Sequence, residues 1–324
     1  MIFEKKIGEV YRSRLFVRYD DNGVAKYFDY TDFDGLIKEE FSFKTKAGNT
    51  LRGGFYSYPD ANRERLIIFE HGMGGGHLSY MKEIEYLARN GFLVLSYDHT
   101  GCMRSEGEGC NGFSQSLADL DACIEAIIKE GRYTESDISV VGHSWGAFST
   151  MNICALHPDV ACIVGVSGFA SVKRMISQSF AGLLTPYKSY IYNIEKSANP
   201  DYCDFDAAIS LADFKGRGLI IHSRDDKTVS AKIHFDYLRE QLKNNGNIRF
   251  LSVDGKNHNP NYTKNAVKLL SEYVAELTKR VKDGSLAAAE ARREFVSSFD
   301  WDKMTEQDAL VWDEIISTLK EADA

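Results

Sequence analysis

The sequence lacks an apolar stretch long enough to span a membrane, and it lacks an excess of basic residues. Its first residues, Met-Ile-Phe-Glu-Lys-Lys-Ile-Gly-Glu, place charges where a secretory signal would need an apolar run. The formal net charge is −8, which argues against nucleic acid or an anionic membrane as a partner. We therefore expect a cytoplasmic protein with no membrane span and no nucleic-acid partner.

Motifs for metal, phosphate and disulfide chemistry are also missing. The six cysteines form no C-x-x-C pair, no segment carries H-E-x-x-H, and the glycine-rich run after residue 71 fits neither a P-loop nor G-x-G-x-x-G. Cys102 and Cys110 are close enough in sequence to pair across a loop, but a cytoplasmic protein favours reduced thiols. Four residues near expected strand ends suit hydrogen bonding to the scaffold better than metal binding: His71, His77, Asp98 and His99. We expect no metal and no other cofactor.

The sequence does contain a regular alternation of strand and helix patterns. Two strand-like runs around a turn form an expected hairpin within residues 36–58. Buried-strand runs then alternate with helical patterns; the strands are expected at 66–70, 92–97, 138–141, 160–166, 218–222 and 247–253, and the helices at 78–89, 114–130, 145–156, 230–245 and 261–282. This order predicts an α/β fold with a mainly parallel, doubly wound sheet and an N-terminal hairpin.

The alternation divides the chain into four parts. We expect an N-terminal arm at 1–35, a core at 36–166 and 216–283, and an aromatic-rich helical cap inserted at 167–215. Residues 284–324 read as an acidic helical extension with ten acidic residues against four basic ones. Its last helix is expected to open with a capping box at Thr305 and Asp308, and it carries an apolar stripe: Ala309, Trp312, Ile315, Ile316 and Leu319. That stripe requires burial against the main body or a second copy, which makes these helices a candidate homodimer surface.

The most informative motif is Gly142-His143-Ser144-Trp145-Gly146, which lies between an expected strand and an expected helix. A sharp turn from strand to helix crowds the positions two residues on either side of the serine, and glycine relieves that crowding. Ser144 would then be exposed at the carboxyl end of the strand. The pattern predicts that Ser144 is a catalytic nucleophile.

A serine nucleophile needs a base and an acid that orients the base, each expected after a later strand. Asp225 and Asp226 follow the strand that ends near His222, and His258 follows the strand that ends near Val253. The chain order is therefore Ser, Asp, His. The spacing alone leaves both aspartates open as the acid, because one of them can equally be a turn or cap residue.

Charge that develops on a substrate oxygen needs two donors. We expect the main-chain N–H groups of Trp145, at the start of the helix, and of Met73, in the glycine-rich loop, to supply them. The candidate substrate contacts are His77 from that loop and Phe169 and Tyr187 from the cap.

Taken together, these motifs resemble the α/β-hydrolases. They comprise His71-Gly72, Asp98-x-x-Gly101 with Ser105-x-Gly107, the serine motif, the run from His222 to Val229, and Gly255-x-x-His258. They are most similar to the branch with serine aminopeptidases, monoglyceride lipases and small bacterial esterases, over about residues 40 to 280. The resemblance implies that Asp226 is the acid and that residues 167–215 form the cap.

These observations predict a serine hydrolase that works through an acyl-enzyme, and a carboxylesterase for small to medium apolar acyl or aryl esters is the first expectation. The alternatives are a peptidase of the serine aminopeptidase kind, which needs cap carboxylates facing the site, or a lipase or thioesterase. Four such carboxylates are available: Glu195, Asp201, Asp204 and Asp206. A hydrolase fold that only binds a ligand is a further alternative, against which the complete Ser, Asp and His set argues.

Overall fold

The computed structural model describes residues 2–322 and contains one sheet of eight strands in the order β1-β2-β4-β3-β5-β6-β7-β8. The hairpin strands β1 and β2 are antiparallel, and β2 is antiparallel to β4, whereas all later pairs are parallel. The mainly parallel sheet with an N-terminal hairpin is thus confirmed. The strands are β1 Ile37–Lys44, β2 Thr50–Ser57, β3 Asn62–Glu70, β4 Phe92–Tyr97, β5 Ile138–His143, β6 Cys162–Val166, β7 Arg217–Ser223 and β8 Ile248–Val253.

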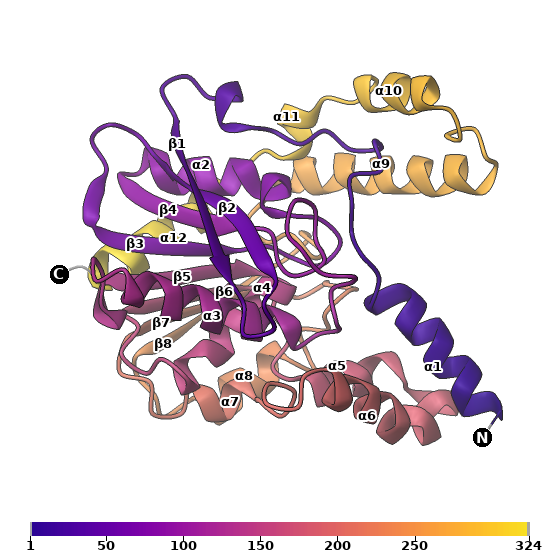
Figure 1. Cartoon of the computed structure of the whole chain (residues 1–324), viewed down its shortest axis with the longest axis horizontal. Coiled ribbons are helices and arrows are strands. Elements are labelled where there is room, and N and C mark those ends of the chain that lie inside the picture. Colours follow the sequence, from indigo (N-terminus) through magenta and orange to yellow (C-terminus); the bar gives the residue numbers. More distant parts are fainter. Residues whose placement is uncertain (1, 323–324) are drawn as a thin grey trace.

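Helices cover both faces of the sheet (Figure 1). The α-helices are α1 Ile2–Leu15, α2 Met81–Arg89, α3 Gln115–Lys129, α4 Trp145–Asn152, α5 Val172–Ser179, α6 Lys188–Ala198, α7 Ala207–Ser210, α8 Phe235–Gln241, α9 Lys264–Lys282, α10 Ala289–Ser297, α11 Trp301–Met304 and α12 Ala309–Ala322. Short 3₁₀ helices are η1 Tyr30–Asp32, η2 His77–Tyr80, η3 Glu135–Asp137, η4 Ile153–Ala155 and η5 Gly182–Tyr187. No helix within the described chain combines the length and apolar character needed to cross a bilayer.

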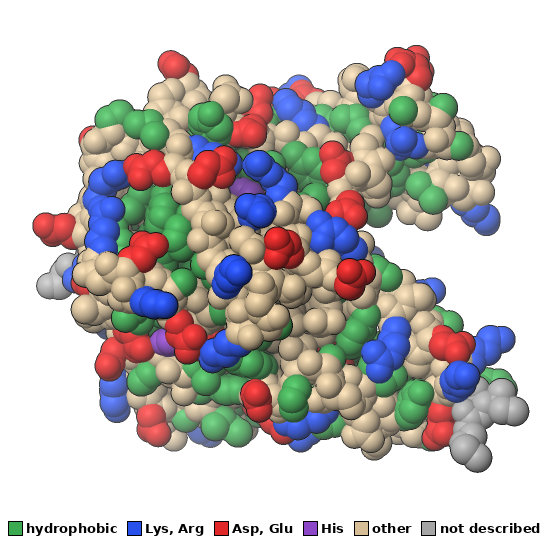
Figure 2. Space-filling model, in the orientation of Figure 1, with side chains coloured by type: hydrophobic (Ala, Val, Ile, Leu, Met, Phe, Trp, Pro, Cys, Tyr) green, Lys and Arg blue, Asp and Glu red, His purple; other side chains and the backbone are tan. Residues whose placement is uncertain are grey.

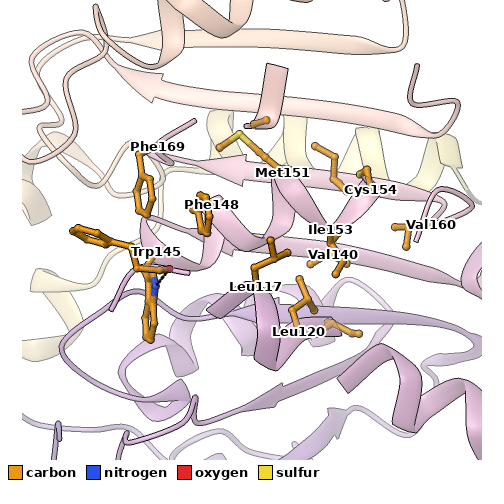
Figure 3. Close-up of a cluster of buried hydrophobic side chains, with 14 of the residues drawn as sticks. Leu117, Leu120, Val140, Trp145, Phe148, Met151, Ile153, Cys154, Val160 and Phe169 are labelled. Atoms are coloured by element: carbon orange, nitrogen blue, oxygen red, sulfur yellow. Dashed lines mark hydrogen bonds between the residues drawn. The ribbon is translucent and has the colours of Figure 1, made fainter. Parts of the chain in front are cut away.

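Two large apolar clusters, one on each face, hold these layers together. One joins the sheet to α3, α4, α8 and the cap, and the other joins it to α2 and α12. Figure 3 shows part of the first cluster, where Phe148 on α4 stacks on Phe169 with their ring centroids 4.7 Å apart. The strands between the two clusters are buried on both faces, which explains why their sequences are continuously apolar rather than alternating.

The N-terminal arm contains a helix that we did not predict. Helix α1 places Ile7, Tyr11 and Leu15 four residues apart on the side that packs against the first cluster. This spacing is a helical signal, but charged residues separate the apolar ones, and the partners of the helix lie in the cap. Figure 1 shows α1 beside α5 and α6. In the cap, α5, η5, α6 and α7 occupy the stretch where short helices were expected.

The apolar stripe near residue 315 is covered by the same chain. Helix α12 packs on β6 and β7, and Trp312, Ile315 and Leu319 are buried in the second cluster. The stripe is therefore not available to a second subunit. Ala309, which we included in it, is exposed, and Val311 is buried instead.

The predicted capping box before α12 is wrong. Asp308, the residue directly before the helix, accepts the N–H of Leu310 (3.0 Å) and is the actual cap. Thr305 instead donates its hydroxyl to the carbonyl of Trp301 (2.7 Å), because it ends the preceding helix α11. The start of α12 thus lies three residues later than a cap at Thr305 would place it.

Helices α9, α10 and α11 form a separate projection with a small apolar cluster of their own. In Figure 1 this projection extends in the same direction as α1, α5 and α6, and Figure 2 shows a hollow in the surface between the two groups. All six cysteine side chains are buried, and no disulfide joins any two of them. Cys110, one of the two considered for a disulfide, instead donates its thiol to the carbonyl of Leu15 (2.9 Å).

Glu195 on α6 is a buried carboxyl that ties the cap to two other parts of the chain. It accepts the hydroxyl of Tyr11 on α1 (2.6 Å) and the N–H of Phe113 in the loop before α3 (2.8 Å). Burial raises the pKa of Glu195 to about 7, although the hydrogen bonds from Tyr11 and Phe113 lower it. Glu195 therefore connects α1, the cap and the body of the protein.

The packing of α12 leads to a first prediction. Replacing Trp312 with alanine should lower the free energy of unfolding by about 3 to 5 kcal/mol, because it empties a large buried site between α12 and the sheet. Leu310→Ala on the exposed side of the same helix, where leucine is 79% exposed, should change it by about 0.5 kcal/mol or less. Urea unfolding measures both. Equal effects of the two substitutions would contradict the assignment of α12 to the core.

Glu195 leads to a second prediction, on pH. Its folded pKa lies above the ordinary value of 4.5, so its contribution to stability is complete below that value and is lost as the pH rises through about 7. Between pH 4.5 and about pH 7, the free energy of unfolding of the wild type should fall by roughly 3 kcal/mol relative to that of Glu195→Gln, because one pKa unit corresponds to about 1.4 kcal/mol. Urea unfolding of both proteins across this pH range tests this. Parallel stability curves would refute it.

Candidate active site

Ser144 occupies a strained turn between β5 and α4 at the centre of the sheet. Its φ of 56° and ψ of −110° lie outside the regions that a residue with a side chain normally adopts. The turn is held by the pairing of β5 with β3 and β6, and by the N–H of Ser144, which donates to the carbonyl of Val166 (2.8 Å). The serine side chain remains partly exposed although the residues on both sides of it are buried.

The two flanking glycines are required by close approach of the backbone. A Cβ atom at Gly142 would lie 2.4 Å from the carbonyl oxygen of Gly146, and a Cβ at Gly146 would lie 2.2 Å from the carbonyl oxygen of Glu70. Both distances are far below van der Waals contact. The G-x-S-x-G spacing is thus imposed by the geometry of this turn.

Ser144, His258 and Asp226 form a chain of hydrogen bonds although they are far apart in sequence. The Nε2 atom of His258 lies 2.8 Å from Ser144 Oγ, and its Nδ1 atom lies 2.8 Å from Asp226 Oδ2. A carboxylate can only accept, so Nδ1 carries the proton and Nε2 is free to accept the serine hydroxyl proton. The arrangement has the geometry of a nucleophile, a base and an orienting acid.

The two neighbouring aspartates have different partners in the structure, and only Asp226 contacts His258. Besides His258, Asp226 accepts the N–H groups of Thr228 (2.8 Å) and Val229 (3.0 Å), while His222 Nε2 lies 3.1 Å from its Oδ2. Burial alone would raise the pKa of Asp226, but the hydrogen bonds from His222 and His258 outweigh it and hold the pKa well below the ordinary value. The carboxylate beside His258 is therefore ionised near neutral pH.

Asp225 points the other way and organises the loop that carries His258. It accepts the N–H groups of Gly255 (2.9 Å) and Lys256 (3.2 Å) and the hydroxyl of Ser223 (2.6 Å). These bonds make it a structural residue of the turn.

His143, which we did not predict, holds the backbone of His258, and Tyr80 in turn holds the ring of His143. His143, directly before Ser144, lies with its Nε2 atom 2.8 Å from the carbonyl oxygen of His258, and its Nδ1 atom lies 2.9 Å from the hydroxyl of Tyr80. Burial, followed by the nearby His258, lowers the pKa of His143 to about 3. His143 is thus neutral: it donates to the carbonyl and accepts from Tyr80. Its position directly before Ser144 in the motif could have indicated that it belongs to the site.

The glycine-rich loop lies against the serine. A Cβ atom at Gly72 would lie 3.5 Å from Ser144 Cβ. His71 Nε2 accepts the N–H of His99 (3.0 Å), so its Nδ1–H donates to the carbonyl of Gly72 (2.7 Å). Because the carbonyl and the following N–H of a trans peptide point in opposite directions, this bond turns the N–H of Met73 away from His71. No acceptor within residues 2–322 takes the main-chain N–H of Met73 or Trp145.

Two of the three expected substrate contacts lie in the interior. His77 is 1% exposed and is hydrogen-bonded to Asp98 (2.7 Å) and to the hydroxyl of Tyr56 (2.9 Å). Phe169 is 2% exposed and stacks on Phe148. Their hydrogen bonds and packing are satisfied within the protein, so neither is placed as a substrate contact. Tyr187, at the end of η5, is partly exposed.

The histidines and carboxylates near the strand ends hold loops together. Burial alone would raise the pKa of Asp98, but His77 outweighs burial and holds the pKa at about 2. The Oδ1 atom of Asp98 also accepts the N–H of His77 (2.9 Å), and its Oδ2 atom accepts the N–H of Arg104 (3.1 Å). Among residues 2–322, no three histidine, cysteine, aspartate or glutamate side chains are placed to hold a metal ion.

Comparison with known sequences gives matches around the serine motif. A model of the family described as serine aminopeptidase, S33, matches residues 61–204. This range contains Met73, Ser144 and most of the cap, and it ends before Asp226 and His258. The esterase YjfP of Escherichia coli (strain K12) is 24% identical over 190 residues, which cover 54% of this chain and 75% of that protein.

Comparison with solved structures extends over more of the chain. The esterase Pf2001 of Pyrococcus furiosus has a TM-score of 0.58 at 17% identity and covers 82% of this chain and 98% of its own. The α/β hydrolase GrgF from Penicillium sp. sh18 has a TM-score of 0.53 at 14% identity, with 81% of this chain and 99% of its own covered. The esterase domain of a Rhodothermus marinus protein has a TM-score of 0.51 at 13% identity, with 75% and 98% covered. At these identities the likeness shows a common fold.

The crowded turn leads to a third prediction. Gly146→Ala should lower the free energy of unfolding by about 1 to 3 kcal/mol, because the added methyl group would overlap the carbonyl of Glu70 and force the backbone to move. Gly246→Ala is the matched control, since a Cβ there has no neighbour within 4 Å. Urea unfolding compares the two variants. A Gly146→Ala protein as stable as the control would show that the turn is looser than described.

Proposed function

We propose that this chain, which has the fold of the α/β-hydrolases, is a serine hydrolase that cleaves carboxylic esters through an acyl-enzyme. The observation that carries this proposal is the hydrogen-bonded chain from Ser144 through His258 to Asp226. It starts at a nucleophile that is partly exposed in a strained turn and ends at a carboxylate with a lowered pKa. A serine nucleophile, a histidine base and an orienting carboxylate are the groups that acyl transfer of this kind uses.

In the first half of the reaction, Ser144 Oγ attacks the ester carbonyl while Nε2 of His258 takes the serine proton. Asp226 keeps the imidazole in the tautomer with a free Nε2 and stabilises the imidazolium that forms. The alcohol then leaves with the proton from His258. The hydrogen bond from His143 to the carbonyl of His258 (2.8 Å) fixes the base during both transfers.

The developing oxyanion is bound by two main-chain N–H groups, those of Trp145 and Met73. The first lies at the start of α4, where the helix dipole adds to its effect. The second is directed by the bond between His71 and the Gly72 carbonyl. In the second half of the reaction, water activated by His258 attacks the acyl group and releases the acid. Every proton and nucleophile in this scheme comes from the chain or from water.

The cap favours an ester substrate over a peptide with a free amino terminus. Three of the four cap carboxylates that could bind such an amino group have other partners. Glu195 is buried against Tyr11 and Phe113, Asp204 pairs with Lys196 (2.7 Å), and Asp206 caps α7 by accepting the N–H of Ala208 (3.0 Å). The esterase YjfP of Escherichia coli, to which the chain is 24% identical over 190 residues, supports the same choice.

A fourth prediction tests the mechanism. Ser144→Ala should abolish labelling by a fluorophosphonate probe and lower the kcat for p-nitrophenyl acetate by about 10⁴-fold or more, since the nucleophile is lost. Ser189→Ala, an exposed serine of the cap, is the matched control and should label and turn over like the wild type. Gel fluorescence and absorbance assays measure the two effects.

The same assays separate the alternatives. A wild-type protein that neither labels nor hydrolyses the ester would favour a ligand-binding role. Faster turnover of amino-acid arylamides than of p-nitrophenyl esters would favour the peptidase.

A further inference from the structure

A large cavity lies between α1 and the cap. It has a volume of about 730 Å³ and is lined by Ile7 and Val10 of α1, by Phe113, and by Ile176, Phe180 and Leu184 of the cap. This volume falls in the range of ligand-binding pockets, about 300 to 1,000 Å³. The only charged residues of its lining are two cations of α1, Lys6 and Arg14. The rest of the lining is mostly apolar, which suits an apolar ligand.

The wall formed by α1 is fixed in place by specific contacts. Tyr11 donates its hydroxyl to the buried Glu195 (2.6 Å), and a Cβ atom at Gly8 would lie 2.9 Å from the ring of Tyr190 on α6. Glycine at position 8 therefore allows α1 to pack closely on the cap. A helix that only covered the surface would need neither contact. One wall of the cavity is therefore a helix in a fixed position.

One residue of the lining, Phe113, contacts Trp145, the residue that follows Ser144. The carbonyl of Phe113 accepts the indole N–H of Trp145 (2.6 Å), and Trp145 directly follows Ser144. The N–H of Phe113 is held by Glu195 (2.8 Å). The main chain of Phe113 is therefore fixed between Trp145 and Glu195, and its side chain lines the cavity. Helix α1 itself lies outside residues 61–204, the range matched by the family model.

We propose that this cavity is the binding site for the acyl chain of the ester, and that the preferred substrates carry a medium-length apolar acyl group. This inference rests on the proposed function and adds the substrate class to it. The chain lies between α1 and the cap, while its carbonyl carbon is held at Ser144. Exposed apolar residues beside the cavity, Phe3 (72% exposed) and Leu184 (42% exposed), give the apolar chain a path from solvent. Figure 2 shows hydrophobic side chains on this part of the surface, over α1 and the cap.

The test compares two esters that differ only in the acyl chain, p-nitrophenyl octanoate and p-nitrophenyl acetate. Ile7→Trp fills the cavity from α1 and should lower the ratio of kcat/KM for octanoate to that for acetate by about tenfold or more, because several methylene groups lose their burial. Ser13→Trp places the same bulk on the exposed part of α1 and should leave the ratio unchanged. Leu184→Trp fills the cavity from the opposite wall and should act like Ile7→Trp.

The acetate assay shows that each variant is folded and active. The inference is overturned if the ratio stays the same in both filling variants, or if acetate and octanoate turnover fall together. Either result leaves fluorophosphonate labelling of Ser144 intact. A wild type that neither labels nor hydrolyses acetate would instead refute the proposed function itself.

Discussion

The candidate site depends on one backbone constraint, the positive φ of Ser144. Holding a residue with a side chain in this conformation costs about 1 to 3 kcal/mol, and the surrounding structure must supply that energy. Strand β5 does so from the middle of the sheet, with β3 on one side and β6 on the other. The turn has room only because residues 142 and 146 lack side chains. Ser144 is therefore held partly exposed by strands at the centre of the sheet.

Much of this arrangement could be predicted from the sequence, since the decisive signals are local. Strand β4 was expected at 92–97 and is found at Phe92–Tyr97. This mainly apolar run is bounded by Asn90-Gly91 before it and by Asp98 after it. The serine motif and the positions of Asp226 and His258 after later strands are likewise readable from spacing. The choice between Asp225 and Asp226 was different. It required the family resemblance, because the direction of two neighbouring side chains in a loop is set by the groups around them.

What could not be predicted depends on partners that are distant in the sequence. His77 and Phe169 have the chemistry of substrate contacts, but contacts with Asp98 and Phe148 bury them. The apolar stripe of α12 showed that a partner was required, and only the fold identifies that partner as the sheet. The motif gave His143 no role of its own, whereas its ring holds the carbonyl of His258, 115 residues away.

The bond between Tyr11 and Glu195 joins residues 184 positions apart, and α12, the last helix described, closes one face of the sheet. During synthesis, α1 leaves the ribosome long before α6 exists, and the β6–β7 face remains uncovered until α12 has been made. The apolar surfaces of both regions are therefore exposed throughout most of translation, when long-range contacts cannot yet form. Completion of this fold is consequently a late event in synthesis, because both of these contacts need segments that are made long after their partners.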